Sequence, residues 1–159
     1  MRRPRLLTRR ITLPLLVAAA VVAADQATKQ MARALWEGKR VWVIDGFFGF
    51  TFVENPGAAF SMFGEGGPVF GVVAILVAVF VVWYLAREDR PLAERIGFGL
   101  VLGGALGNLI DRLARGDGLL DGKVIDWVNL WWIPTFNLAD AALTVAVILL
   151  LVHSWRIRN

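Results

Sequence analysis

Four long apolar stretches dominate this 159-residue sequence, and they restrict the chain to folds that place helices in a membrane. A helix that crosses a hydrocarbon layer of roughly 30 Å needs about 20 mostly apolar residues. We expect membrane spans at about residues 11–34, 66–86, 96–114 and 134–154. The long connections, about 35–65 and 115–133, then lie outside the membrane. The fold class expected is an all-α bundle of four transmembrane helices, forming a single integral membrane domain over residues 1–159.

Composition excludes several kinds of active site. Hydrophobic residues make up 57% of the chain and charged residues 19%, whereas a soluble domain is about half apolar and a quarter charged. The absence of cysteine excludes disulfides and thiol catalysis. A single histidine, His153, argues against a His-rich metal site and a Ser-His-Asp triad. We therefore expect no metal and no cofactor. The net charge of +4 informs topology rather than indicating a nucleic-acid partner.

The basic residues predict the orientation of the bundle. Five arginines fall within the first ten residues, three between 87 and 95, and two at 156 and 158. Cytoplasmic segments of membrane proteins carry such an excess of Lys and Arg. Both termini and the hinge at 87–91 are thus expected in the cytoplasm, with the two long connections outside.

The N-terminal segment also resembles a secretory signal peptide. A basic start precedes an apolar run from Ile11, and Val22-Ala23-Ala24 fits a cleavage site. Against that alternative, Asp25, Gln26 and Lys29 continue the helical pattern without a break. Residues 11–34 are therefore interpreted as the first span.

Three aspartates are expected at one depth in the bundle. Asp25 lies 14 residues from Ile11, Asp111 lies 15 from Ile96, and Asp140 lies 14 from Ser154. At about 1.5 Å per residue, each carboxyl sits about 21–23 Å from the cytoplasmic side. Ionisable groups inside a span are energetically unfavourable and usually mark function.

Other polar side chains accompany these acids at helical spacing: Asn137 with Asp140, Asn108 with Asp111, and Lys29 with Asp25. Hydrogen bonds and ion pairs between helices are one explanation, and we expect it to hold for Lys29, Arg112 and Asp111. It does not explain Asp140, which has no basic residue within two turns on its own helix.

Small residues favour close packing of the third span. Gly99, Gly103 and Gly107 recur every four residues, with Gly104 beside them. Such a face lets a neighbouring backbone approach closely, although it says nothing about chemistry.

The first long connection predicts a β-hairpin. Residues 41–44 and 47–53 are β-rich and flank the turn signal Asp45-Gly46. The turn Asn55-Pro56-Gly57 follows, and Gly57 allows another chain to come close to the backbone. The loop is rich in aromatic side chains, which places it at the level of the lipid headgroups, although an ordinary aromatic belt explains much of this composition. These aromatics are Trp42, Phe47, Phe48, Phe50, Phe52, Phe60 and Phe63.

The second long connection contains another acid, Asp126, between apolar neighbours and 14 residues before Asp140. The loop has the length to fold back so that both carboxyls meet. Two carboxyls close together in a low dielectric share one proton, and such a pair performs acid–base hydrolysis without metal or thiol. A Ser61–Lys29 hydrolase is a weaker alternative, because nothing aligns the two, and His153 is expected to be an interfacial residue.

Five motifs in order carry a resemblance that covers nearly the whole chain outside the N-terminal tail and the hinge. They are DQATK at 25–29, NPGAAFS at 55–61, GGALGNLIDR at 103–112, VIDW at 124–127 and FNLAD at 136–140. Together they closely resemble the bacterial lipoprotein signal peptidases, or signal peptidase II. Trp127 stands where that family often has phenylalanine, and Asn129 where a second acid is frequent.

The resemblance implies an aspartyl endopeptidase of the bacterial inner membrane. Such an enzyme removes the signal peptide from diacylglyceryl-modified prolipoproteins, cutting on the N-terminal side of the lipidated cysteine, near the periplasmic face. By motif, the catalytic pair is Asp126 and Asp140, and spacing alone does not choose Asp126 over Asp111. The remaining matched positions are supporting or substrate-binding: Asn55, Gly57, Asn108, Asp111, Arg112, Asn137, Asp25 and Lys29. The resemblance also implies globomycin-type inhibitors and contact with membrane lipid, and we expect a monomer.

Two other functions use acids inside a membrane. A small transporter or proton-relay bundle places carboxylates along its path, but here they cluster at one depth and the two halves show no inverted repeat. A purely structural subunit would use the acids to hold helices together.

Overall fold

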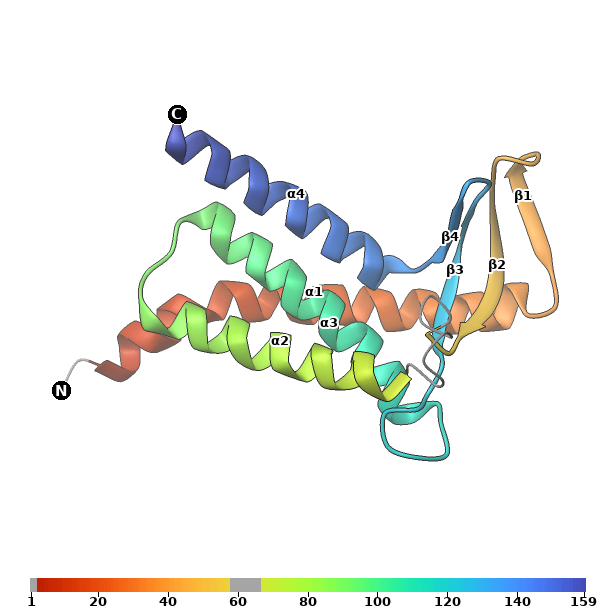
Figure 1. Cartoon of the computed structure of the whole chain (residues 1–159), viewed down its shortest axis with the longest axis horizontal. Coiled ribbons are helices and arrows are strands. Elements are labelled where there is room, and N and C mark those ends of the chain that lie inside the picture. The colour runs from red at the N-terminus through yellow and green to blue at the C-terminus, as the bar shows by residue number, and fades with distance from the viewer. Residues whose placement is uncertain (1–2, 58–66) are drawn as a thin grey trace.

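The structure, a computed structural model, describes residues 3–57 and 67–159. Its elements are α1 (Arg3–Trp36), β1 (Arg40–Ile44), β2 (Phe48–Asn55), α2 (Gly67–Arg87), α3 (Leu92–Ala114), β3 (Val124–Leu130), β4 (Ile133–Phe136) and α4 (Leu138–Arg158). The helices form one bundle, the strands gather at one end of it, and both termini lie at the other end (Figure 1). The predicted class of four apolar helices with a small β-hairpin is confirmed.

All four helices are long and apolar enough to cross a membrane. Side chains on their outer surfaces are apolar and exposed, among them Leu76, Val79 and Leu151. Exposed apolar surface of this kind is expected where helices face lipid. The 34 residues of α1 run without interruption through residues 22–25. The last turn of α1 reaches the sheet, where Trp36 stacks on Phe50 with 4.7 Å between the ring centroids.

The glycines of α3 explain how the bundle closes around its polar residues. A Cβ added at Gly103 would lie 3.0 Å from the backbone of Ala18 in α1, and one added at Gly104 would lie 2.6 Å from the carbonyl oxygen of Ala139 in α4. The predicted small face is therefore confirmed on two sides of α3. It allows α1 and α4 to approach α3 closely, which brings the polar residues of three helices together.

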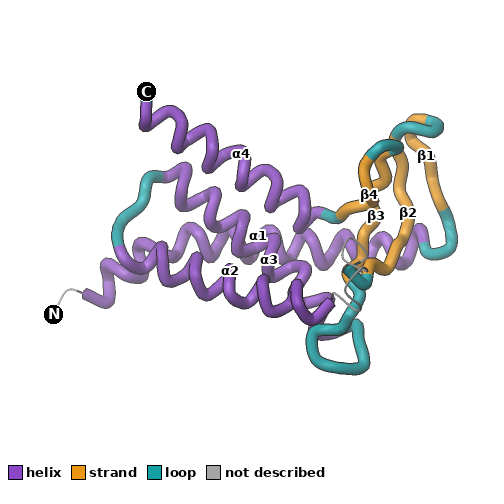
Figure 2. Tube along the Cα trace, viewed as in Figure 1, coloured by secondary structure: helices purple, strands orange, loops and turns teal. Residues whose placement is uncertain are grey.

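The strands form one antiparallel sheet in the order β1-β2-β3-β4 (Figure 2). The predicted hairpin of β1 and β2 is present, and Gly46 in its turn has a φ of +65°. The sequence did not predict that the second connection would extend this sheet with β3 and β4. In the β2–β3 register Val53 lies opposite Asp126 and Asn55 opposite Val124. The predicted positions Phe60, Ser61 and Phe63 lie outside the described residues.

Candidate active site

Asp126 is held on β3, at the end of the sheet nearest the helices. Its side chain is only 3% exposed. One carboxyl oxygen accepts a hydrogen bond of 2.9 Å from Asn55 Nδ2, and the other accepts one of 2.7 Å from Asn137 Nδ2. Both donors are neutral amides, one from the end of β2 and one from the residue before α4.

Asp140 is fixed by the beginning of α4. Asn137 is the N-cap residue, and it forms a capping box with Asp140. The Asn137 side chain accepts a bond of 3.0 Å from the Asp140 amide, while the Asp140 carboxyl accepts one of 3.2 Å from the Asn137 amide. This reciprocal motif satisfies backbone donors that a helix start leaves free. The other oxygen of Asp140 accepts a bond of 2.8 Å from Asn108 Nδ2.

Asp126 and Asp140 line the same cavity, of about 310 Å³. The structure therefore brings the two acids together from a strand and a helix. Four further predicted residues border the cavity: Asn55, Gly57, Asn108 and Arg112. The other lining residues are small or apolar: Phe70, Val73, Ala74, Val77, Ala105, Leu109, Val124 and Leu143. Such a cavity suits an apolar ligand that presents one polar group to the two acids.

The backbone at Gly57 has a conformation that favours glycine. Its φ is +99°, a region that other residues adopt only with strain. The Gly57 amide donates a bond of 2.8 Å to Asn55 Oδ1. That bond fixes the orientation of the Asn55 side chain, so that its amide nitrogen faces Asp126.

Burial raises the pKa of the Asp126 carboxyl to about 6. A buried carboxylate loses hydration, which favours the protonated form. The nearby negative charge of Asp140 acts in the same direction, while the amide donors of Asn55 and Asn137 oppose it. Asp126 therefore retains a proton at a higher pH than an ordinary aspartic acid.

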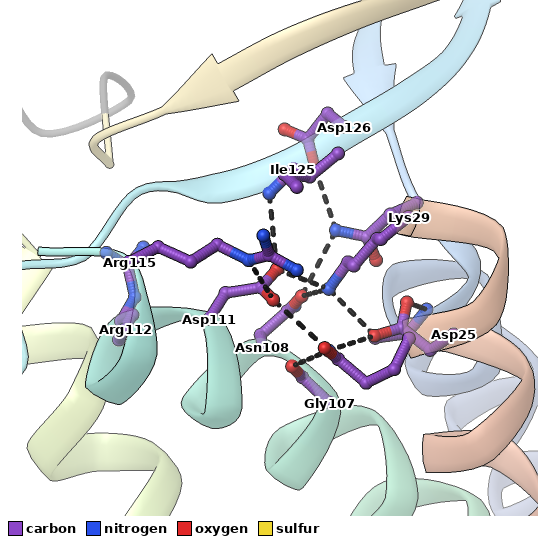
Figure 3. A network of polar contacts seen from close by, with 12 residues as sticks. Asp25, Lys29, Gly107, Asn108, Asp111, Arg112, Arg115, Ile125 and Asp126 are labelled. Carbon is purple, nitrogen blue, oxygen red and sulfur yellow. Dashed lines mark hydrogen bonds and ion pairs between the residues drawn. The ribbon is translucent and has the colours of Figure 1, made fainter. Parts of the chain in front are cut away.

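A second polar group lies between α1 and α3 next to this cavity (Figure 3), and its three members on these helices are fully buried. Lys29 Nζ is 2.8 Å from a carboxyl oxygen of Asp25 and 2.8 Å from one of Asp111. Arg115 Nε lies 2.9 Å from the other oxygen of Asp111. We call Asp25, Lys29, Asp111 and Arg115 the charged cluster. The predicted pairing of Asp25 with Lys29 is confirmed.

The charged cluster also connects separate elements. Asp25 Oδ1 accepts a bond of 3.0 Å from the amide of Ala139 in α4, and Asp111 Oδ2 accepts one of 3.2 Å from the amide of Ile125 in β3. Ile125 precedes Asp126, and Ala139 precedes Asp140. The cluster thus holds the backbone on which each acid of the cavity is carried.

The ion-pair partners of Asp111 are Lys29 and Arg115, and the adjacent Arg112 makes other contacts. Arg112 turns away because it is adjacent to Asp111 and leaves the helix in another direction. Its guanidinium donates a bond of 3.2 Å to the carbonyl oxygen of Gly122 and lies over the ring of Phe70.

Two residues of the site were not predicted. Arg115 stands four residues after Asp111, a spacing that favours pairing, but it lies beyond the expected end of the span. Gln26 donates bonds of 3.1 Å both to Asp111 and to the carbonyl oxygen of Gly107. His153, at the far end of α4, lies 3.7 Å from Glu94 and away from this site. Among the described residues no group of three or more His, Cys, Asp or Glu is arranged to hold a metal.

Comparison with known proteins identifies the family. A family model described as signal peptidase (SPase) II matches residues 17–156. The chain belongs to the signal peptidase II family. A signal peptidase II relative, the lipoprotein signal peptidase of Rhodococcus jostii, is 43% identical over 137 residues, covering 86% of this chain and 69% of that protein. The lipoprotein signal peptidase of Moorella thermoacetica is 43% identical over 139 residues, covering 86% of this chain and 88% of that protein.

Solved structures of bacterial membrane enzymes have the same fold as this chain. A bacterial membrane enzyme determined by the in meso method at 2.3 Å resolution superposes with a TM-score of 0.79 at 30% identity, covering 94% of this chain and 91% of that chain. Another bacterial membrane enzyme, at 1.9 Å resolution, gives a TM-score of 0.77 at 31% identity, covering 90% of this chain and 92% of that chain. The resemblance predicted from the motifs is confirmed. As a signal peptidase II, the chain is a bacterial membrane protein and a protease that removes signal peptides from prolipoproteins.

Proposed function

We propose that the chain is an aspartyl endopeptidase whose catalytic pair is Asp126 and Asp140, and that it cuts on the N-terminal side of a diacylglyceryl-modified cysteine. One observation carries the proposal: two carboxyls from different elements line one cavity and accept hydrogen bonds from neutral amides. Among the described side chains, none of the ion pairs includes either acid. Two carboxyls close together in a low dielectric share a proton, and such a pair performs both halves of acid–base catalysis.

In the proposed reaction Asp126 carries the shared proton and Asp140 is ionised. Asp140 takes a proton from water as the water oxygen attacks the peptide carbonyl carbon, and Asp126 gives its proton to the carbonyl oxygen. When the tetrahedral intermediate collapses, that proton returns to Asp126 and the carbon–nitrogen bond breaks. The leaving nitrogen takes the proton from Asp140, which restores both acids.

The supporting residues divide into three sets in this proposal. Asn55 and Asn137 orient Asp126, and Asn108 orients Asp140. Gly57 and Arg112 border the cavity as substrate-binding positions. The charged cluster, with Asp25, Lys29 and Asp111, holds the backbone beneath the pair.

The location follows from the charge distribution and from the arrangement of the bundle. Both termini lie at the end of the bundle opposite the sheet (Figure 1), and that end carries the arginine excess. We place the chain in the inner membrane with its termini in the cytoplasm and the cavity near the periplasmic face. There the apolar cavity wall meets the acyl chains of the substrate and surrounding lipid. We expect the enzyme to act as a monomer, and globomycin-type inhibitors to occupy the cavity.

The decisive experiment is cleavage of a synthetic prolipoprotein peptide whose cysteine carries diacylglycerol. We expect the wild-type chain to cut this peptide and to leave the same peptide without lipid intact. Asp126→Asn and Asp140→Asn should each abolish cleavage while the protein remains folded and inserted. Near-normal turnover by either variant contradicts the assignment of the pair.

A further inference from the structure

Lys29 makes a third contact that its charge balance does not require. Its side chain is fully buried, and two carboxylates, those of Asp25 and Asp111, already flank Nζ. Nζ also lies 3.0 Å from Oδ1 of Asn108, a neutral side chain. An ammonium has three donors and no acceptor. All three donors of Lys29 are therefore used, and one of them leads out of the charged cluster.

That contact favours one of the two orientations of the Asn108 amide. Because Lys29 only donates, it selects the oxygen of the amide and leaves the nitrogen on the opposite side. The nitrogen there donates the bond of 2.8 Å to Asp140. A rotated amide would set its NH₂ group against the ammonium and its oxygen against a carboxylate, and both contacts would be repulsive.

A second amide is coupled to the first. Asn137 Nδ2 donates a hydrogen bond of 3.1 Å to Asn108 Oδ1 and one of 2.7 Å to Asp126. Its own oxygen faces the backbone amide of Asp140, which fixes its orientation independently. Asn108 Oδ1 therefore accepts from both Lys29 and Asn137, and the two amides present donors to both acids of the cavity.

We propose that Lys29 is a positioning residue for hydrolysis, acting through Asn108 to keep an amide donor directed at Asp140. The proposal rests on the proposed catalytic pair. The bond from Asn108 holds the Asp140 carboxyl in the position from which it takes the proton of the attacking water. Lys29 thus acts on the pair through the Asn108 amide, in addition to pairing with Asp25 and Asp111.

The test is a double-mutant cycle between Lys29 and Asn108. Lys29→Met removes the donors but leaves two carboxylates facing one remaining cation, Arg115, which threatens folding. The cycle therefore uses Asp25→Asn as its common background, since Lys29→Met then leaves one acid, Asp111, paired with Arg115. We expect Lys29→Met to lower kcat at least about tenfold when Asn108 is present, with KM for the lipidated peptide within about twofold.

In the matched background with Asn108→Ala, the same Lys29→Met change should lower kcat by less than about twofold, because the amide through which Lys29 acts is then absent. An equal loss in both backgrounds, or a loss that follows the folded fraction measured by thermal unfolding, overturns the proposal. A merely structural lysine would produce one of these two results.

A readout independent of turnover separates this proposal from the proposed function. The side-chain NH₂ signals of Asn108 in ¹⁵N-labelled protein are assigned by their absence in Asn108→Ala. We expect Lys29→Met in the Asp25→Asn background to shift or broaden them as the amide loses its fixed orientation. Unchanged signals overturn the positioning role, whereas turnover by Asp126→Asn contradicts the catalytic pair whatever these signals do.

Discussion

The charged cluster and the pair of acids in the cavity are adjacent, yet their carboxyls have opposite kinds of partner. Asp25 and Asp111 share the Lys29 ammonium, and Arg115 adds a second cation at Asp111. Asp126 and Asp140 accept only amide N–H donors among the hydrogen bonds described above. A cation compensates the charge of a buried carboxylate directly, whereas neutral donors orient it with less compensation. The difference separates the acids that hold the backbone from the two acids proposed to react.

The largest effect is expected when a cation is placed beside the acids of the cavity, as cations lie beside the acids of the charged cluster. Asn55→Lys places an ammonium beside Asp126, which favours its ionised form and removes the proton needed by the carbonyl oxygen. We expect kcat for the lipidated peptide to fall at least about 100-fold, within the range that acid–base catalysis contributes. Asn55→Ala, which removes the donor without adding charge, is the control and should lose less. Equal losses would show that charge is not what distinguishes the two regions.

Removing an acid from the charged cluster should instead act on stability. Asp111→Asn leaves Arg115 without its carboxylate and weakens the link to the Ile125 amide. Breaking a buried ion pair destabilises by about 3–5 kcal/mol, and activity should decline as the support of β3 weakens. Thermal unfolding in detergent, with the exposed Asp117→Asn as control, measures this. Complete inactivity at unchanged stability would assign Asp111 to catalysis.

Asp126 should make stability depend on pH. Its pKa of about 6 in the folded state exceeds the ordinary value of 3.8, so the folded chain binds more protons between these values. The raised pKa contributes about 2–3 kcal/mol to the free energy of unfolding at low pH, and this contribution is lost as the pH rises through about 6. Asp126→Asn lacks this loss, so it should gain stability relative to wild type between pH 4 and pH 7. A difference that stays constant with pH contradicts the raised pKa.

The smallest effect is expected at an ion pair on the surface. Glu54 lies 3.2 Å from Arg33 and 3.9 Å from Lys123, and all three side chains are more than a third exposed. Exposed pairs contribute about 0–1 kcal/mol and are screened by salt. Glu54→Gln should therefore change the free energy of unfolding by less than about 1 kcal/mol. Unfolding in low and high salt checks this, and a larger effect that persists in high salt would mean that the pair acts as a buried one.

The depth of the helical acids could be predicted from the sequence because a helix has a fixed rise per residue. Counting residues placed Asp25, Asp111 and Asp140 at one level, and the structure links Asp25 with Asp111 through Lys29. Asp25 also reaches the Ala139 amide next to Asp140. The hairpin turn at Asp45-Gly46 was predictable for a similar reason, since its signal is local.

The position of Asp126 could not be predicted in this way. It depends on the pairing of β2 with β3, whose residues lie about 70 positions apart, as Val53 and Asp126 do. No local pattern specifies such a pairing, and only the family resemblance chose Asp126 over Asp111 as the partner of Asp140. Arg115 was missed although its spacing from Asp111 was visible, because the expected span ended one residue earlier.

Because Asp126 is carried on β3, whether its carboxyl faces the cavity depends on whether its position along the strand is odd or even. Successive residues of a strand point to opposite faces, so inserting one residue between Val124 and Asp126 would turn that carboxyl away from the cavity, while two would restore the face but displace it along the strand. A change of length in the loop between α3 and β3 disturbs no such alternation. Within β3, an odd number of inserted residues reverses the face to which Asp126 points, whereas an even number keeps it.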